Sequence, residues 1–252
     1  MNQRVEILGA NIDRARKEDV LEGIFRMIVA GERGYLCTMN AALLMQMRRD
    51  EHLARCVQRA RFVVADGQSL VWASRLLQQP LPERVAGIDL IDPIAERAAR
   101  EGMGVYVLGA TAEVCRRMAE RLLATYPALR VCGHADGYFA PAEEPARVQA
   151  IAASGAQILF VAMGVPRQEL FLERNWDALG VAFAMTVGGS FDVLTGRLKR
   201  APILLQKIGL EWAFRLAQEP RRLWKRYLVT NTQFIALTGR EFLRSRPWQR
   251  SP

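Results

Sequence analysis

Short apolar runs alternate along the chain with longer amphipathic stretches. Six runs have the length and composition of buried strands, at residues 34–39, 62–65, 105–108, 129–134, 158–163 and 181–187. Between them lie segments with apolar residues at helical spacing, such as Ala112–Thr125 and residues 145–153. This alternation predicts βαβ units, and hence an α/β fold with a mainly parallel, Rossmann-like sheet flanked by helices.

The pattern changes near residues 197–202, where RLKRAP introduces a basic segment and Pro202 begins a new helical pattern. We therefore expect a main α/β domain at residues 1–196 and a basic helical C-terminal appendage at residues 197–252. The net charge of +9 lies entirely in the appendage: residues 1–196 hold 22 Lys and Arg against 23 Asp and Glu, whereas residues 197–252 hold 13 against 3. Such a block predicts an anionic partner, either nucleic acid or a membrane surface.

The segment EPRRLWKRYL in this basic block favours a membrane. Its apolar and aromatic residues share one helical face and its cations flank them, as in helices that lie on an anionic bilayer. The alternative is a helix packed on the main domain with its charges merely solvated. We expect no nucleic-acid partner, because no module that reads nucleic acid is recognisable. The face consists of Leu223, Trp224, Tyr227 and Leu228, and the flanking cations are Arg221, Arg222, Lys225 and Arg226.

Several classes of protein are disfavoured by what the sequence lacks. No window of about twenty residues is apolar and free of charge, and the N-terminal segment lacks the apolar region of a signal peptide. His52 and His134 do not form a metal-ligand pair, so we expect no metal site. The four cysteines show no CxxC spacing and predict buried thiols of a reduced, cytosolic protein rather than a zinc site; they are Cys37, Cys56, Cys115 and Cys132.

Small or polar residues follow four of the predicted strands. The carboxyl ends of parallel strands meet at one edge of a sheet, where ligands of such folds bind, so these residues should gather there. Asp66 has a simpler interpretation as a helix N-cap, which the segment FVVADGQSL alone favours over a catalytic base. The residues are Thr38, Asn40, Asp66, Gly109 and Gln168.

Two further segments carry candidate ligand contacts. Arg84, in LPERVAGIDL, can bind a phosphate through paired hydrogen bonds or form a surface ion pair with Glu83 or Asp89. In TVGGSFDVLTG, the paired glycines Gly188 and Gly189 permit close approach of a ligand to the backbone. Asp192 then lies where it can hydrogen-bond a base or ribose; the alternative is a plain strand-to-helix turn capped by Ser190.

Motifs of several nucleotide-dependent and hydrolytic enzymes are missing. The chain has no G-x-G-x-x-G dinucleotide fingerprint, no P-loop and no G-x-S-x-G elbow. It also has no D-x-D pair that would hold a divalent cation against a nucleotide diphosphate. Any phosphate would then be bound by arginines and by helix N-termini, such as the one after Gly109.

Seven segments together resemble the WecG/TagA/CpsF glycosyltransferases, in the same order and at compatible spacing from about residue 5 to about residue 235. They are TMNAALL, ADGQSLVWASRLL, LPERVAGIDL, HADGYF, FVAMGVPRQE, VGGSFDVLTGRLKRAP and GLEWAFRLAQEPRRLWKRYLV. The resemblance implies transfer of a sugar from a UDP-sugar to a sugar on a polyprenyl diphosphate, by a peripheral enzyme at the cytoplasmic face of the plasma membrane. N-acetylmannosamine, its uronic acid and glucose are all transferred within the family.

The resemblance also assigns expected roles by position. It makes Asp66 the catalytic base and places Thr38, Asn40, Arg84 and Gln168 around the reacting groups. Nucleotide binding falls to Asp192, with Gly109, Gly188 and Gly189 as expected donor contacts. The basic appendage, in the stretch around Arg215 to Arg226 that includes Arg222, is expected to close the site and meet the membrane. The implied reaction is inverting and needs neither metal nor cofactor.

Two alternatives remain open from the residues alone. A nucleotide-binding oxidoreductase would share the fold class, although the dinucleotide fingerprint is missing. A non-enzymatic basic protein that binds lipid or nucleic acid would explain the appendage but not the polar residues at several strand ends. Self-association into a homo-oligomer is also left open.

Overall fold

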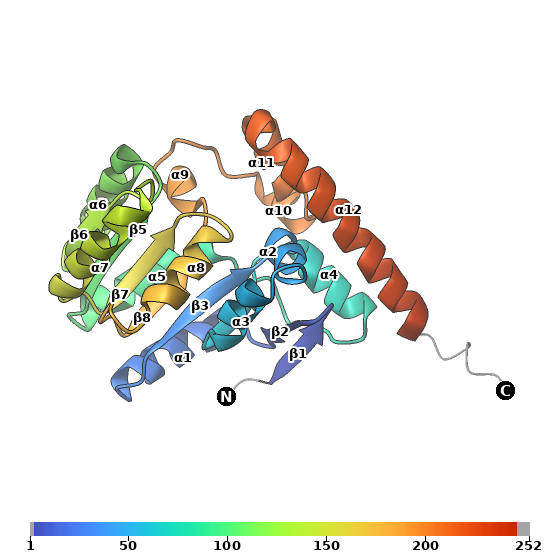
Figure 1. The fold of residues 1–252 in the computed structure, drawn as a ribbon, viewed down its shortest axis with the longest axis horizontal. Helices are drawn as coiled ribbons and strands as arrows, with labels where there is room; N and C mark the ends of the chain where they lie inside the picture. The colour runs from blue at the N-terminus through green and yellow to red at the C-terminus, as the bar shows by residue number, and fades with distance from the viewer. Residues whose placement is uncertain (1–2, 246–252) are drawn as a thin grey trace.

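A sheet of six parallel strands forms the centre of the computed structural model, which describes residues 3–245 (Figure 1). The strand order is β4-β3-β8-β7-β5-β6. The bounds are β3 (Gly34–Met39), β4 (Phe62–Ala65), β5 (Gly104–Gly109), β6 (Arg130–Ala135), β7 (Ile158–Ala162) and β8 (Phe183–Thr186). The expected α/β fold is confirmed, and all six predicted runs form strands whose ends differ by at most two residues from the prediction.

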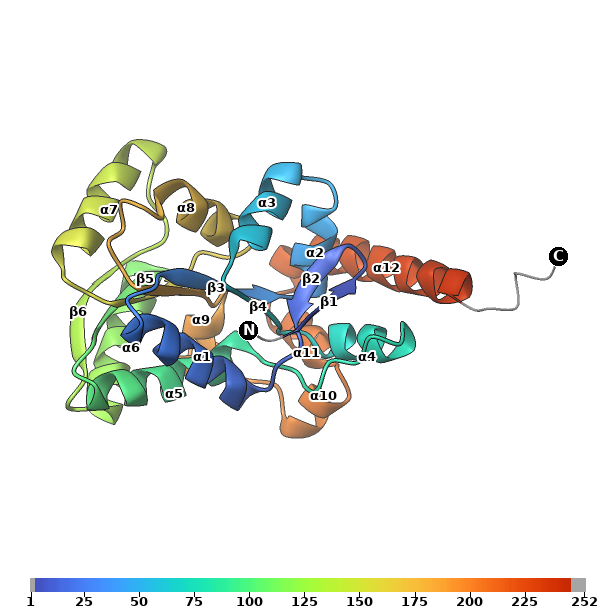
Figure 2. The ribbon, with the colours of Figure 1, turned by 90° about the horizontal axis from the view of Figure 1, so that it is seen from below.

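Helices cover both faces of this sheet (Figure 2). Alternate strand residues enter separate cores: Leu36 packs in one core, whereas its neighbours Tyr35 and Cys37 pack in the other. One face is covered by α1 (Lys17–Val29), α5 (Gly87–Arg100) and α6 (Ala112–Thr125). The other is covered by α2 (Ala41–Met47), α3 (Glu51–Arg59), α7 (Glu144–Ala153) and α8 (Arg167–Asn175). Shorter elements are α4 (Gln68–Leu76), η1 (Pro141–Glu143) and α9 (Ser190–Leu194).

An N-terminal hairpin that the hydrophobic pattern did not predict lies beside the edge strand β4. It consists of β1 (Arg4–Ile7) and β2 (Ala10–Asp13), joined by a turn in which Leu8 and Gly9 both have positive φ. The Asp13 carboxylate accepts a hydrogen bond from the Val63 N–H at 2.7 Å and pairs with Arg4 at 3.0 Å. This carboxylate therefore ties the hairpin to the sheet edge.

The appendage, meaning residues 197–245 in the described structure, forms three helices. They are α10 (Ile203–Lys207), α11 (Glu211–Gln218) and the long α12 (Pro220–Ser245). Helix α12 lies along α2 (Figure 1) and buries Leu223 and Phe234. Trp72 of α4 lies over Gly209, where an added Cβ would approach the ring to 2.6 Å. The appendage is thus packed against the main domain at two places.

The expected apolar face of α12 is only partly exposed. Leu223 is buried against the main domain, whereas Trp224 and Leu228 are exposed. Other large apolar side chains exposed on α4 and the appendage include Trp72, Leu76, Ile203, Leu204 and Ile235. In residues 3–245 no helix combines the length and the apolar character needed to cross a bilayer. Of the cysteines, Cys132 is only partly buried, unlike the other three.

Candidate functional site

A cavity of about 450 Å³ lies at the carboxyl ends of β3, β4, β7 and β8. The strand ends and the turns after them form one wall, and α11, α12 and the turn before α11 form the other. The two parts of the chain therefore enclose it together. Its lining contains most of the residues singled out by the sequence: Thr38, Asn40, Asp66, Arg84, Gln168, Gly188, Gly189, Asp192, Arg215 and Arg222.

Gly109 is the one sequence-predicted residue that does not line the cavity; its neighbour Ala110 does. Gly109 has φ +131°, and a Cβ there would overlap the backbone of Ala162 on β7. The need for glycine at this position is explained by strand packing. The turn after β5 nevertheless reaches the cavity, and Thr111 caps the helix α6 that follows.

Asp66 directs its carboxylate into the cavity from the end of β4. Its Oδ1 accepts a hydrogen bond at 3.2 Å from the N–H of Gly87, the first residue of α5. The cap position of α4 is occupied by Gly67, with no side-chain hydrogen bond. Asp66 therefore does not cap the helix that follows it, and the simpler interpretation of this residue is wrong.

The environment of Asp66 stabilises the neutral carboxyl relative to the ionised carboxylate, in comparison with water. Burial raises the pKa of Asp66 to about 6, and the carboxylates of Glu211 and Asp89 also raise it. The Arg84 guanidinium and the hydrogen bond from Gly87 act in the opposite direction. A carboxylate with a pKa near 6 is ionised at neutral pH and still basic enough to accept a proton from an alcohol during reaction.

Thr38 and Asn40 fix the end of the central strand β3. The Thr38 hydroxyl donates to the carbonyl of Thr186 on β8 at 3.0 Å, and the Thr38 N–H donates to the Thr186 hydroxyl at 3.2 Å. Asn40 caps α2 by accepting from the Leu43 N–H at 3.0 Å. Both side chains thus hold the cavity wall in place as well as facing the cavity.

Gln168 joins the turns after β7 and β8. Its Oε1 accepts hydrogen bonds from the N–H of Gly164 at 3.2 Å and of Gly188 at 3.0 Å. Its Nε2 donates at 2.8 Å to Glu169, which is fully buried. Burial raises the pKa of Glu169 to about 7, and its Oε2 has no hydrogen-bond partner within residues 3–245. This pair forms a rigid support beneath the cavity.

Arg84 connects the main domain to the appendage. It forms an ion pair with Glu211 of α11 and a longer one, at 3.4 Å, with Asp89 of α5. It also donates to Gln206 of α10 at 3.4 Å. The predicted ion pair with Asp89 is therefore present, whereas Glu83 instead accepts a hydrogen bond from the Lys17 N–H. The guanidinium lies in the cavity wall and is mostly buried.

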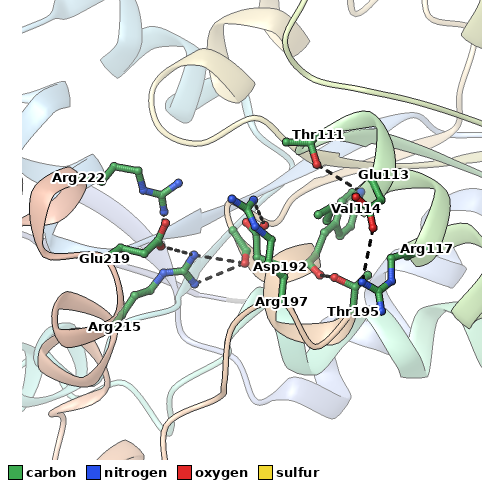
Figure 3. A network of polar contacts seen from close by, with 12 residues as sticks. Thr111, Glu113, Val114, Arg117, Asp192, Thr195, Arg197, Arg215, Glu219 and Arg222 are labelled. Carbon is green, nitrogen blue, oxygen red and sulfur yellow. Dashed lines mark hydrogen bonds and ion pairs between the residues drawn. The ribbon is translucent and has the colours of Figure 1, made fainter.

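A second set of charges lies around Asp192 and Glu219 (Figure 3). Asp192 pairs with Arg197 at 2.8 Å. Glu219 lies between Arg215 and Arg222, at 3.6 Å and 2.6 Å. Arg215 also donates to the Gly189 carbonyl at 3.4 Å from both terminal nitrogens. A Cβ at Gly189 would overlap this guanidinium, so the paired glycines make room for an appendage arginine.

Two residues of the site were missed from the sequence, and a third, Arg226, was expected only as part of the stretch that closes the site. Glu211 and Glu219 are two of only three acidic residues in the basic appendage, and each pairs with an arginine that lines the cavity. The rarity of acidic residues in this basic segment could have identified both glutamates as partners of nearby arginines. Arg226 also lines the cavity, and its buried Nε has no hydrogen-bond partner among the described residues. In the sequence Arg226 could not be distinguished from the neighbouring surface cations.

A comparison with protein families identifies the family of the chain. The model described as "Glycosyl transferase WecG/TagA/CpsF family" matches residues 5–247 of the chain. This match covers the main domain and nearly all of the appendage, so both walls of the cavity belong to the matched region.

Proposed function

The chain belongs to the WecG/TagA/CpsF family of glycosyltransferases, which act in cell-surface glycan synthesis, and from this premise we propose its reaction. It transfers a hexose or N-acetylhexosamine from a UDP-sugar to a sugar carried on a polyprenyl diphosphate. The observation that carries the proposal is the Asp66 carboxyl, with its raised pKa, in a cavity that is also lined by four arginines: Arg84, Arg215, Arg222 and Arg226.

The proposed chemistry is a single displacement with inversion at the anomeric carbon. A hydroxyl of the acceptor sugar attacks this carbon from the face opposite the leaving group. Asp66 accepts the hydroxyl proton as the new C–O bond forms. The bond to UDP breaks, and UDP leaves with the bonding electrons. A positioned general base of this kind contributes about 10²–10⁴ in rate.

The charge that develops on UDP is met by fixed donors. Arg84, Arg215 and Arg226 line the cavity, and the N-terminus of α6 begins beside it, after Ala110. Two of the three carboxylates that line the cavity in the described structure, Asp192 and Glu211, already pair with arginines. The donor diphosphate would take over Arg84 from Glu211. Asp192 would then hydrogen-bond the nucleoside.

The appendage would hold the enzyme at the lipid acceptor. Its excess of positive charge lies beside exposed apolar side chains, including Trp224, Leu228 and Ile235 on α12. Basic residues near an anionic bilayer contribute about 1 kcal/mol each, so several together bind reversibly. We propose peripheral binding at the cytoplasmic face, which brings the cavity to an acceptor that stays in the bilayer.

The test combines binding and turnover. The full-length protein is incubated with UDP-linked glucose, N-acetylmannosamine and N-acetylmannosaminuronic acid, each with a short-chain lipid-diphosphate-linked sugar, and released UDP is measured. We expect UDP release that requires both substrates, and UDP should raise the melting temperature. Stabilisation by NAD and not by UDP would overturn the proposal in favour of an oxidoreductase. Binding of anionic vesicles with no UDP binding would favour a non-enzymatic lipid-binding protein.

A further inference from the structure

A histidine, a cysteine and a glutamate meet between α3 and α8, outside the cavity. His52 and Cys56 are one helical turn apart and share one face of α3. Glu173 reaches them from α8, 121 residues beyond His52. One ligand atom from each side chain lies within 4.8 Å of the other two. In residues 3–245 no other group of three such side chains lies this close.

This donor set suits a particular class of cation. Imidazole nitrogen, thiolate sulfur and carboxylate oxygen together are typical of zinc and its neighbours, whereas calcium and magnesium take oxygen ligands. We propose that His52, Cys56 and Glu173 bind a single zinc-class divalent cation with water as the fourth ligand. The side chain of His52 is 48% exposed, which leaves a path for the ion and the water.

The geometry requires only a small convergence. Zinc–ligand bonds of about 2.0–2.3 Å in a tetrahedron place ligand atoms roughly 3.3–3.8 Å apart. His52 Nε2 and Glu173 Oε2 are already at 3.1 Å. The Cys56 sulfur lies within 4.8 Å of both atoms, so it must approach by at most about 1 Å, which a side-chain rotation can supply.

The charges also fit. Binding displaces the Cys56 thiol proton to solvent, and one thiolate, one carboxylate and a neutral imidazole then neutralise the dication. Without the ion the thiol is protonated, because burial and the nearby Glu173 raise the pKa of Cys56 to about 11. The competing structural interpretation is an ion-pair cluster in which His52 and Arg59 both contact Glu173, at 3.1 and 3.4 Å. In that interpretation Cys56 is simply a core residue.

A bound ion would join two helices that position the cavity. Helix α8 begins at Arg167, directly before Gln168, and α3 leads into β4 and Asp66. The site would therefore have a structural role, separate from sugar transfer. Sequence reasoning missed it because the pairing of α3 with α8 is a property of the fold, and neither helix carries a metal motif by itself.

Cobalt(II) provides a direct test on the full, reduced chain. A thiolate ligand gives intense charge-transfer absorption in the near ultraviolet, and we expect this band to saturate at one equivalent. Zinc should displace cobalt and raise the melting temperature. His52→Gln and Glu173→Gln should weaken cobalt binding by at least about 10–100-fold. This is the loss of metal affinity when a residue that only hydrogen-bonds a ligand is removed, and removing a ligand should cost more. Cys56→Ala should abolish the band.

Matched controls make the result decisive. Cys132→Ser and His134→Gln remove the partly buried cysteine and the other histidine, and both should keep the band. Failure of the wild-type protein to show a thiolate band with excess cobalt would overturn the proposal, and so would persistence of the band in Cys56→Ala. If Cys56→Ala folds poorly by circular dichroism, the exposed His52 variant decides alone, since unaltered affinity there also overturns the site. None of these readouts depends on sugar transfer.

Discussion

The main domain and the appendage are built on opposite principles. The main domain carries a net charge of −1 and encloses two dense cores separated by the sheet. The appendage carries +10, and only a few of its residues, such as Leu223 and Phe234, are buried. Large apolar side chains remain exposed on α10 and α12. The main domain is stabilised by its own buried cores, whereas the appendage depends on the surfaces against which it packs.

This contrast assigns different work to the two walls of the cavity. The main domain supplies the carboxylate of Asp66, the proposed base, at a position set by the end of β4. The appendage supplies side-chain charges, Glu211, Arg215 and Arg226, that depend on how α11 and α12 are docked. Changes in the main domain should therefore alter the chemistry sharply, and changes on the outer side of the appendage should alter where the protein binds.

The largest expected effect is at Asp66. Asp66→Asn keeps the shape and the ability to accept from Gly87 but removes the base, so the rate of sugar transfer should fall by about 10²–10⁴. The pKa of Asp66 is raised on folding, so ionisation of this carboxyl lowers the free energy of unfolding. The stability associated with the neutral carboxyl is fully present below pH ~4 and is lost as the pH rises through about 6. The variant should therefore be more stable than wild type at pH 8, by about 1–3 kcal/mol. Turnover and thermal unfolding measure the two effects.

Asp177→Asn is the matched control, because Asp177 is exposed after α8. It should change neither turnover nor melting temperature. An Asp66→Asn variant within a few-fold of wild-type activity would remove the base from the mechanism. For wild-type enzyme the same ionisation predicts that kcat/KM rises with pH and levels off above about pH 6–7.

The next effect concerns the outer side of the appendage. Leu228 is 63% exposed on α12, and Leu228→Glu replaces an apolar contact with a negative charge. Binding to anionic vesicles should weaken by about 10–100-fold, from the combined loss of apolar burial and of electrostatic attraction. Vesicle co-sedimentation measures this. Leu123→Glu on α6, also an exposed helical leucine, should have little effect; equal loss in both variants would contradict a role specific to the appendage.

The smallest effect is at Glu169. The pKa of this carboxyl is raised to about 7 by burial, so its contribution to stability is complete below pH ~4.5 and is lost as the pH rises through about 7. Glu169→Gln can still accept the hydrogen bond from Gln168 but cannot ionise. The free energy of unfolding of this variant should fall less between about pH 5 and 7 than that of wild type. The net gain at pH 8 should be only about 1 kcal/mol, because the new amide buries an unpaired N–H₂ and this cost offsets part of the benefit. Denaturant unfolding at several pH values tests this, with exposed Glu6→Gln as the control.

The sheet could be predicted because its information is local. Each strand is a short apolar run closed by a turn, so the six strands and the shared edge of Thr38, Asn40 and Asp66 follow from periodicity alone. The hairpin at Arg4–Asp13 was missed because its strands have four residues each. They are held by contacts distant in sequence, in which Ile7 and Ile12 join the core and Asp13 bonds to β4.

The appendage side of the site could be predicted only as a type of charge. The basic block was evident, but the pairing of Arg84 with Glu211, and of Arg215 with Gly189, depends on the docking of helices distant in sequence. The split of the α12 face, with Leu223 buried and Leu228 exposed, depends on how α12 docks along α2, where Phe234 joins the core of the main domain. The family match extends over both parts and accords with their joint enclosure of the cavity.

The shared acceptor at Gln168 has a mechanical consequence. One amide oxygen accepts N–H hydrogen bonds from two loops that leave adjacent strands, so moving either loop away from Gln168 breaks one of these two hydrogen bonds. We therefore expect the loops after β7 and β8 to move together. We then expect changes in the shape of the cavity to fall mainly on the opposite half, where the lining comes from α11 and α12 and is joined through exposed ion pairs such as Arg222 with Glu219.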